Sequence, residues 1–229
     1  MKLAISIWQY FTAIVVRPLL LLFAGLKIDG THFLEVVNGP VIFISNHRNE
    51  FDPWLLATSV PFKFHKIVLP FRFATHARFM GNPFLKPILK LWGCYPIAPG
   101  SGSLEQVLDS ALKITKDREQ SMVFFPEGKL VKKGEPSKAR PGIAYLAKTS
   151  KWLIMPVGLT GVEDLSFLKF ITFQNKLTVR FGQPFYYHEI ANEGEDLIAV
   201  SEKMMQRVNK LVNGVKVTSQ DLSFARGGR

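Results

Sequence analysis

Short apolar runs, each followed by turn residues, alternate with segments of helical periodicity along this chain. The runs Val41-Ile42-Phe43-Ile44 and Met122-Val123-Phe124-Phe125 have the length and composition of buried strands. Similar but weaker patterns predict further strands over residues 33–37, 64–69, 94–98, 153–157 and 177–181.

Helical patterns fill most of the intervals between these runs. Ser103 and Gln106 have the spacing of a capping box that starts a helix ending near residue 116. Residues 70–92 also look helical, with an interruption at Gly81-Asn82-Pro83, and further helices are expected over residues 139–149 and 195–213. Strands alternating with helices predict an α/β fold, a single domain whose mostly parallel or mixed central sheet is flanked by helices.

The N-terminal segment is apolar enough to associate with a membrane. Residues 3–26 are largely apolar, while Lys2, Ser6, Gln9 and Arg17 recur at about one helical turn. A central arginine costs about 2.5–3.5 kcal/mol in a bilayer, which favours a peripheral or shallowly embedded segment over a clean span. The alternative is a core helix that covers the sheet. We therefore divide the chain into membrane-associating N-terminal helices (1–30), an α/β domain (31–214) and a flexible basic tail (215–229).

The chain is strongly basic, with 29 Lys and Arg against 18 Asp and Glu and a formal net charge of +11. Such an excess suits nucleic-acid phosphates or an anionic membrane surface. Because no nucleic-acid recognition motif is present, we expect a phospholipid surface, on the cytoplasmic face of a membrane, as the partner. The single cysteine, Cys94, excludes an internal disulfide, and no metal site is expected because ligand spacing is lacking.

A histidine and an aspartate five residues apart follow the first strong strand. His47 is expected in the loop that leaves this strand, and Asp52, just before Pro53, where the chain turns into a helix. Loops at the carboxyl ends of strands carry the chemistry of open α/β folds. A carboxylate there accepts the imidazole Nδ1–H and leaves Nε2 as a base. His188 and Glu193 repeat the interval, but in a polar connection beyond the core strands.

A second polar motif, Phe125-Pro126-Glu127-Gly128, follows the other strong strand. Glu127 projects from the turn, and Gly128 permits a tight backbone path near a ligand. The glutamate is suited to a hydroxyl and the following cations to a phosphate, although a basic surface loop has the same pattern. These cations are Lys129, Lys132, Lys133, Lys138 and Arg140.

Together, the two motifs resemble those of the glycerolipid acyltransferases typified by 1-acyl-glycerol-3-phosphate acyltransferase. Asn46-His47-x4-Asp52 and Phe125-Pro126-Glu127-Gly128 carry the resemblance, and Ile154-Met155-Pro156-Val157-Gly158 resembles the late Pro-Val strand of that family. The Gly93-Cys94-Tyr95-Pro96-Ile97 block matches in position and hydrophobicity. The resemblance covers roughly residues 38–185.

Two arginines that this family associates with the phosphate of the acceptor are missing here. The second block ends in Ala98-Pro99 instead of an arginine, and Lys129-Leu130 stands where Thr-Arg usually follows the Glu-Gly pair. Lys129 supplies a point charge instead of a bidentate fork. The candidates for replacing the lost arginines are Arg72, Arg78, Lys138 and Arg140.

The resemblance implies acyl transfer from acyl-CoA or acyl carrier protein to a hydroxyl of a lysophospholipid-like acceptor, with 1-acyl-glycerol-3-phosphate expected and no further cofactor. His47 and Asp52 would be catalytic, and Glu127, Gly128, Lys129, Arg72, Lys138 and Arg140 would bind substrate. Two alternatives stay open, an acyltransferase for a different lipid acceptor and a non-catalytic protein that binds membrane surfaces.

Overall fold

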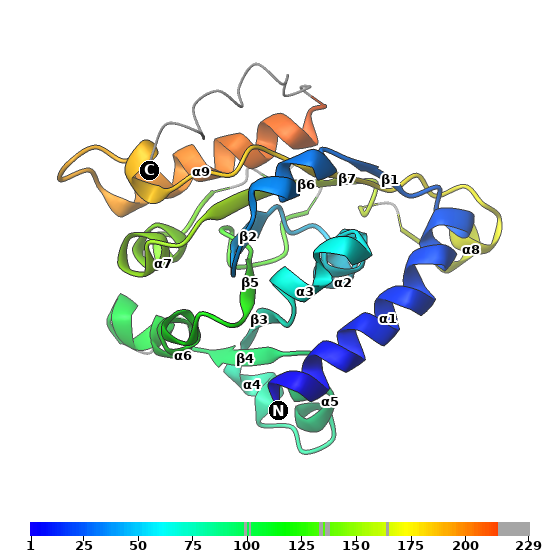
Figure 1. The fold of residues 1–229 in the computed structure, drawn as a ribbon, viewed down its shortest axis with the longest axis horizontal. Helices are drawn as coiled ribbons and strands as arrows, with labels where there is room; N and C mark the ends of the chain where they lie inside the picture. Colours follow the sequence, from blue (N-terminus) through cyan, green and yellow to red (C-terminus); the bar gives the residue numbers. More distant parts are fainter. Residues whose placement is uncertain (99, 101, 133–134, 136–137, 164, 215–229) are drawn as a thin grey trace.

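A seven-stranded sheet forms the centre of the computed structural model, which describes residues 1–98, 100, 102–132, 135, 138–163 and 165–214 (Figure 1). The strands are β1 (Lys27–Asp29), β2 (Ile42–Ser45), β3 (Phe71–His76), β4 (Cys94–Ile97), β5 (Ser121–Phe124), β6 (Ile154–Thr160) and β7 (Thr178–Phe181). Their order in the sheet is β1-β7-β6-β2-β5-β3-β4. Neighbouring strands are parallel except β6 and β7, which confirms the predicted α/β class with a mixed sheet.

Helices cover both faces of this sheet. The α-helices are α1 (Lys2–Phe23), α2 (Asp52–Ser59), α3 (His65–Val68), α4 (Ala77–Met80), α5 (Leu85–Leu91), α6 (Leu104–Asp117), α7 (Gly142–Ser150), α8 (Phe167–Ile171) and α9 (Leu197–Val212). Short 3-10 helices are η1 (Thr31–Val36), η2 (Phe62–Phe64) and η3 (Tyr187–Glu189). One face carries α6, α7 and α9, and the other carries α1, α2 and α3 (Figure 1).

Alternate residues of each central strand enter two separate cores. In β2, Phe43 packs into the core under α1 and α2, while Ile42 and Ile44 pack into the core under α6, α7 and α9. Successive side chains of a strand point to opposite faces, so a strand covered on both sides is apolar at every position. This is why β2 appears in the sequence as an unbroken apolar run.

Helix α1 turns its polar residues toward the protein. Gln9, Thr12 and Ala13 are buried, whereas Leu3 and Leu22 are 73% and 63% exposed. The predicted polar stripe therefore exists, but it faces the domain and leaves the apolar side of the helix uncovered. Within the described part of the chain, α1 is also long and apolar enough to cross a membrane.

The Gln9 side chain joins α1 to the end of the β3–β4 ladder. Its Nε2 donates to the carbonyls of Phe71 and Trp92, both at 2.9 Å, and its Oε1 accepts from the Phe71 amide at 2.8 Å. Gly93 makes this close approach possible, since a Cβ there would lie 2.3 Å from the Phe71 carbonyl oxygen and φ is +83°. The carboxamide thus takes the place of a further peptide in the ladder.

Two predicted strands are wrong. Residues 33–37 lie largely in η1, and Phe33, Leu34 and the following residue Val37 are buried at helical spacing. Residues 64–69 contain α3, and the strand expected there follows as β3, within the segment predicted to be helical. Short apolar runs fit both periods, and tertiary packing decides between them.

The remaining elements lie close to their predicted positions. The strand predictions at residues 94–98, 153–157 and 177–181 correspond to β4, β6 and β7, and Ser103 and Gln106 form the predicted capping box of α6. One N-terminal helix is present instead of several among the described residues, and β1 joins the sheet from within residues 1–30. The predicted tail, 215–229, lies outside the described residues.

Candidate active site

Both polar motifs lie at the same edge of the sheet. His47 follows the carboxyl end of β2 by two residues, and Glu127 follows that of the parallel neighbour β5 by three. The late Pro156-Val157 pair lies in β6, on the other side of β2 and in register with Ile44 and Ser45. The three sequence blocks are therefore adjacent strands, with the motif residues together at their carboxyl ends.

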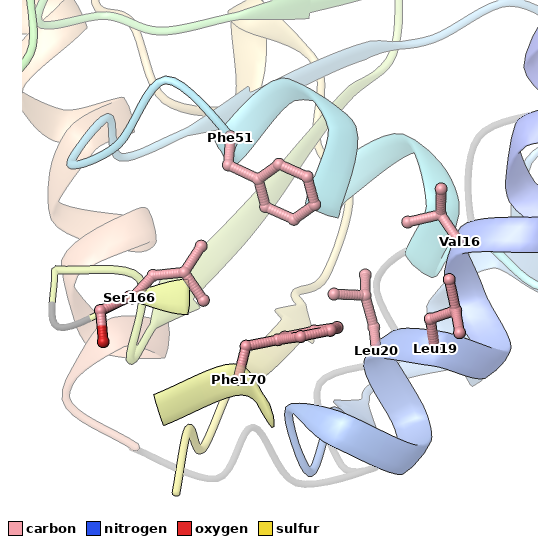
Figure 2. Close-up of a pocket in the computed structure, with 7 residues that line it drawn as sticks. Val16, Leu19, Leu20, Phe51, Ser166 and Phe170 are labelled. Carbon is pink, nitrogen blue, oxygen red and sulfur yellow. The ribbon is translucent and has the colours of Figure 1, made fainter. Parts of the chain in front are cut away.

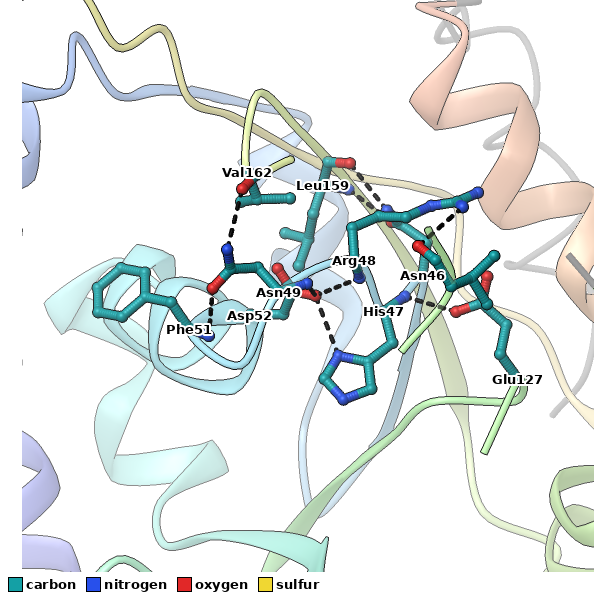
Figure 3. Close-up of polar contacts among 10 residues, drawn as sticks. Asn46, His47, Arg48, Asn49, Phe51, Asp52, Glu127, Leu159 and Val162 are labelled. Carbon is teal, nitrogen blue, oxygen red and sulfur yellow. Dashed lines mark hydrogen bonds and ion pairs between the residues drawn. The ribbon is translucent and has the colours of Figure 1, made fainter. Parts of the chain in front are cut away.

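His47 is held by a carboxylate and by an aromatic ring. Its Nδ1 lies 3.0 Å from Asp52 Oδ2 (Figure 3). Its ring stacks on Phe125 at a centroid distance of 4.2 Å. The His47 side chain is 19% exposed, while that of Asp52 is fully buried. With Nδ1–H donating to Asp52, Nε2 is the acceptor of the neutral ring, which is the arrangement of a general base.

Asp52 also organises the loop between β2 and α2. Its Oδ2 accepts hydrogen bonds from the amides of Arg48 and Asn49 at 2.6 and 2.8 Å. As the first residue of α2, it places a negative charge at the positive end of that helix. One oxygen therefore fixes both the imidazole and the loop that carries it. Asp52 was expected near the N-cap of the helix, but Phe51 is the N-cap residue and Asp52 follows it.

Glu127 contacts the backbone of the catalytic loop, the segment between β2 and α2 that carries the candidate catalytic residues His47 and Asp52. Its Oε2 accepts from the His47 amide at 2.6 Å, and the residue is only 2% exposed. The role expected for Glu127, to hold the acceptor hydroxyl, stays a prediction, and the structure adds this contact with His47. Glu127 thus links the β5 motif to the β2 motif and sets the position of the histidine.

Two asparagines tie the loop to β6 and to the segment after it. Asn46 is buried, and its carboxamide donates to the Leu159 carbonyl at 2.9 Å and accepts from the Leu159 amide at 2.8 Å. Asn49 donates to the Val162 carbonyl at 3.1 Å and accepts from the Phe51 amide at 2.9 Å (Figure 3). These contacts fix the loop without using the catalytic side chains.

The segment after Gly128 runs over the catalytic loop. Val131 donates its amide to the His47 carbonyl at 2.9 Å, and Arg48 Nη1 donates to the carbonyls of Val131 and Lys132, both at 3.2 Å. Gly128 has φ +65°, and a Cβ there would lie 2.7 Å from Arg140 Cδ, so the glycine makes room for this arginine.

The predicted phosphate-binding cations divide into two groups. Lys129, Lys138 and Arg140 are exposed on the segment that crosses the loop, and Lys129 Nζ lies 4.0 Å from Glu135. Arg72 lies elsewhere, because its guanidinium donates to the Gly93 carbonyl and to Gln120 at 2.7 Å each.

The register of the sheet explains the position of Arg72. It pairs with Met122, near the start of β5, which is about 10 Å or more from Phe125 at 3.3 Å per residue. The prediction that Arg72 binds the substrate at this edge therefore does not fit its position. Arg78, beyond the carboxyl end of β3, is exposed and stacks over Phe79.

An apolar pocket opens beside the catalytic loop, between α1 and α8 (Figure 2). Its volume is about 270 Å³, and Phe51 of the loop contributes to its wall. The residues that line it are Val16, Leu19, Leu20, Phe51, Leu165, Ser166 and Phe170. A cavity with this lining favours an apolar ligand group.

The described residues offer neither a reactive thiol nor a metal site. Burial raises the pKa of the Cys94 thiol to about 11, so the thiol stays protonated at neutral pH and is a poor nucleophile. Among the described residues, no three His, Cys, Asp or Glu side chains are close enough to hold a metal ion.

Several residues of the site had no predicted role. Asn46, Arg48 and Asn49 stand within the motif, but only the structure reveals that they contact β6 and the 128–140 segment. Phe125 was expected as a strand residue, and its stacking on His47 depends on the pairing of β2 with β5. Position beside a catalytic motif is the one sequence signal that these residues share.

Comparisons with known proteins agree with this arrangement. The acyltransferase family model matches residues 26–160, more than half of the chain and all of the β2 and β5 motifs. The crystal structure of the 1-acyl-sn-glycerophosphate (LPA) acyltransferase PlsC from Thermotoga maritima has the same fold, with a TM-score of 0.65 and 15% sequence identity over 93% of this chain and 81% of that one. None of the curated proteins matches the sequence. The matched residues contain both motifs, and the chain belongs to the acyltransferase family.

Proposed function

We propose that this acyltransferase moves a fatty acyl group from a thioester, acyl-CoA or acyl carrier protein, to a hydroxyl of a lysophospholipid-like acceptor, with 1-acyl-glycerol-3-phosphate as the first candidate. The observation that carries the proposal is the contact of His47 with Asp52 after the carboxyl end of β2, where His47 Nδ1 lies 3.0 Å from Asp52 Oδ2. Family membership supports O-acyl transfer, while the donor and the acceptor are our inference.

His47 acts as the general base. Its Nε2 removes the proton from the acceptor hydroxyl while the oxygen attacks the thioester carbonyl, and Asp52 stabilises the imidazolium that forms. The tetrahedral intermediate then expels the thiolate, which takes the proton from His47. One ester and one free thiol result, and no acyl-enzyme is required because the acceptor oxygen is itself the nucleophile.

Glu127 is a positioning residue in this mechanism. It holds the backbone of His47, so its contribution is the placement of Nε2 relative to the acceptor. The exposed cations Lys129, Lys138 and Arg140 on the segment that crosses the loop are proposed to attract an anionic head group.

The apolar pocket beside Phe51 is proposed to hold part of a fatty acyl chain. Its lining is apolar, and Phe51 adjoins Asp52, so a chain in the pocket would begin beside the catalytic loop. The pocket also borders α1, whose uncovered apolar side supports a membrane contact. We propose that α1 lies in the interface of a phospholipid surface, on its cytoplasmic face, because its buried polar side is hydrogen-bonded to the domain.

Free-thiol release tests the proposal. His47→Ala should lower acyl transfer by about 10²- to 10⁴-fold, the usual contribution of a general base. Among the described residues the side chain makes one hydrogen bond, and it is partly exposed, so the thermal midpoint should change little. His188→Ala is the matched control, since His188 is exposed and has the same spacing to a carboxylate, Glu193.

The choice of substrates decides the finer points. Acyl-CoA and acyl carrier protein donors are each assayed against lysophosphatidate, a neutral monoacylglycerol and lysophosphatidylcholine. Thiol release with lysophosphatidate alone would support the first candidate. Release only with another acceptor would refute it and keep the acyltransferase, and full activity of His47→Ala would refute the assigned base.

A further inference from the structure

Helix α5 exposes apolar side chains that the domain does not use. Phe84, at its N-terminal end, is 82% exposed, and Ile88 is 55% exposed. No residue of α5 is buried. Since burial in this protein does not account for these side chains, the uncovered apolar surface marks an interaction site.

Charge and periodicity indicate the chemistry of the partner. Phe84, Ile88 and Leu91 lie on one side of α5 at intervals of four and three residues, and Lys86 and Lys90 lie one turn apart on the other side. Both lysines are exposed. This is the pattern of a short amphipathic helix that lies in a membrane interface, with cations directed at lipid phosphates.

The sequence around α5 lacks any charge that an anionic surface would repel. No aspartate or glutamate occurs between Asp52 and Glu105, whereas this interval contains Lys63, Lys66, Arg72, Arg78, Lys86 and Lys90. An anionic surface is therefore complementary to the exposed cations of this interval, and exposed phenylalanine and isoleucine require an apolar layer directly beneath it. An anionic phospholipid bilayer meets both conditions.

Helix α5 packs against α1, whose apolar side is uncovered. The Trp8 ring in α1 meets the edge of Trp92, at the end of α5, with 6.1 Å between centroids. The two helices lie side by side at the N-terminal end of α1, on the side of the molecule opposite α9 (Figure 1). We infer that Phe84, Ile88, Lys86 and Lys90 form a second membrane-docking element, selective for anionic phospholipid, beside that of α1.

Vesicle binding of the full chain tests this inference without any substrate. Lys86→Gln/Lys90→Gln should weaken binding to phosphatidylcholine vesicles that contain phosphatidylglycerol by about 10- to 30-fold, at about tenfold or less per cation. Binding to pure phosphatidylcholine vesicles should stay unchanged. Phe84→Ser/Ile88→Ser should weaken binding to both. The control is Ile198→Ser/Lys210→Gln on α9, which carries the same residue types on an exposed surface.

A label on α5 gives a readout that does not depend on affinity. In a Cys94→Ala background, an environment-sensitive dye on Phe84→Cys should shift to the blue on anionic vesicles and be quenched by brominated acyl chains. The same dye on Ile198→Cys should do neither. A dye at position 84 that stays in water on vesicle-bound protein would overturn the inference, as would equal binding of the α5 and control variants.

Activity separates this inference from the proposed function. Thiol release from substrates in neutral detergent micelles should be unchanged in Lys86→Gln/Lys90→Gln, because docking is not needed there. A loss in micelles would place these lysines in the substrate site and refute the docking role, whereas a chain without any transferase activity that still shows the α5 dye shift would keep it.

Discussion

The catalytic loop and helix α1 are both held to the domain by buried polar side chains, but they expose different surfaces. The loop exposes a polar group and the helix an apolar face. In the loop, Asn46 and Asp52 direct their polar atoms to the backbone and leave an accessible imidazole. In α1, Gln9 and Arg17 direct theirs to the backbone of the domain and leave an apolar face. The polar atoms of the loop are therefore bonded within the protein, while α1 keeps an apolar side that the domain does not cover.

Under the proposed function, the loop provides the catalytic groups, while α1 provides contact with the lipid. The buried polar side chains of the loop position the proposed base, and those of α1 position its exposed apolar face. We call these buried polar residues anchors. Phe51 joins the two, because it belongs to the catalytic motif and also lines the pocket that α1 borders. Substitutions at the anchors should damage each region in a distinct way.

Asp52→Asn should have the largest effect, because this anchor serves catalysis and folding together. The amide lacks the charge that fixes the His47 tautomer, and transfer should fall by about 10³- to 10⁴-fold. Its two charge-assisted contacts to backbone amides also weaken, which should lower the free energy of unfolding by about 2 kcal/mol. Thiol release and urea denaturation measure the two effects.

His47→Gln is the matched control for that experiment. It removes the base but leaves Asp52 bonded to the Arg48 and Asn49 amides, so activity should fall without a comparable loss of stability. Equal destabilisation by both substitutions would contradict the view that Asp52 organises the loop independently of the histidine.

Gln9→Ala should have the next largest effect, a loss of stability that exceeds the stability loss of Asp52→Asn. It leaves the buried Phe71 amide and the carbonyls of Phe71 and Trp92 without their side-chain partner, at about 1–3 kcal/mol for each group that stays unpaired. We expect the free energy of unfolding to fall by about 3 kcal/mol, measured by urea denaturation.

Ile14→Ala tests the other side of the same helix. Ile14 is 47% exposed, so its truncation should change the unfolding free energy by less than about 0.5 kcal/mol while weakening vesicle binding. A larger stability loss for Ile14→Ala than for Gln9→Ala would mean that the apolar face is covered within the protein.

The sequence identifies the parts of this protein that local chemistry determines. The apolar runs of β2 and β5, the capping box of α6 and the His47–Asp52 spacing are all readable within a few residues. The contact of Glu127 with the His47 amide is not, because it joins residues 80 positions apart through strand pairing. The direction of the α1 polar stripe likewise depends on what lies beneath the helix.

The wrong assignments have the same physical origin. Residues 33–37 and 64–69 are short apolar segments. Such a segment can bury its apolar side chains either as a helix or as a strand, so its sequence does not decide between them. Arg72 was a candidate for phosphate binding because of its charge, but the register of β3 against β5 places it near the other end of the strands. Charge is visible in a sequence, and register is not.

The smallest expected effect is the contribution of His65 to the pH dependence of the protein's stability. Its Nε2 donates to the Val60 carbonyl at 3.0 Å, which also accepts from Arg17, and its buried Nδ1 has no partner among the described residues. Burial, helped by the charge of Arg17, lowers the pKa of His65 below its ordinary value of 6.5.

The unfolded chain therefore takes up a proton at His65 that the folded protein resists. The contribution of His65 to stability should be constant above pH 6.5 and decrease as the pH falls below it. Urea midpoints between pH 5 and 8 measure this slope, which His65→Gln should reduce; an equal slope in that variant would assign the effect to other groups.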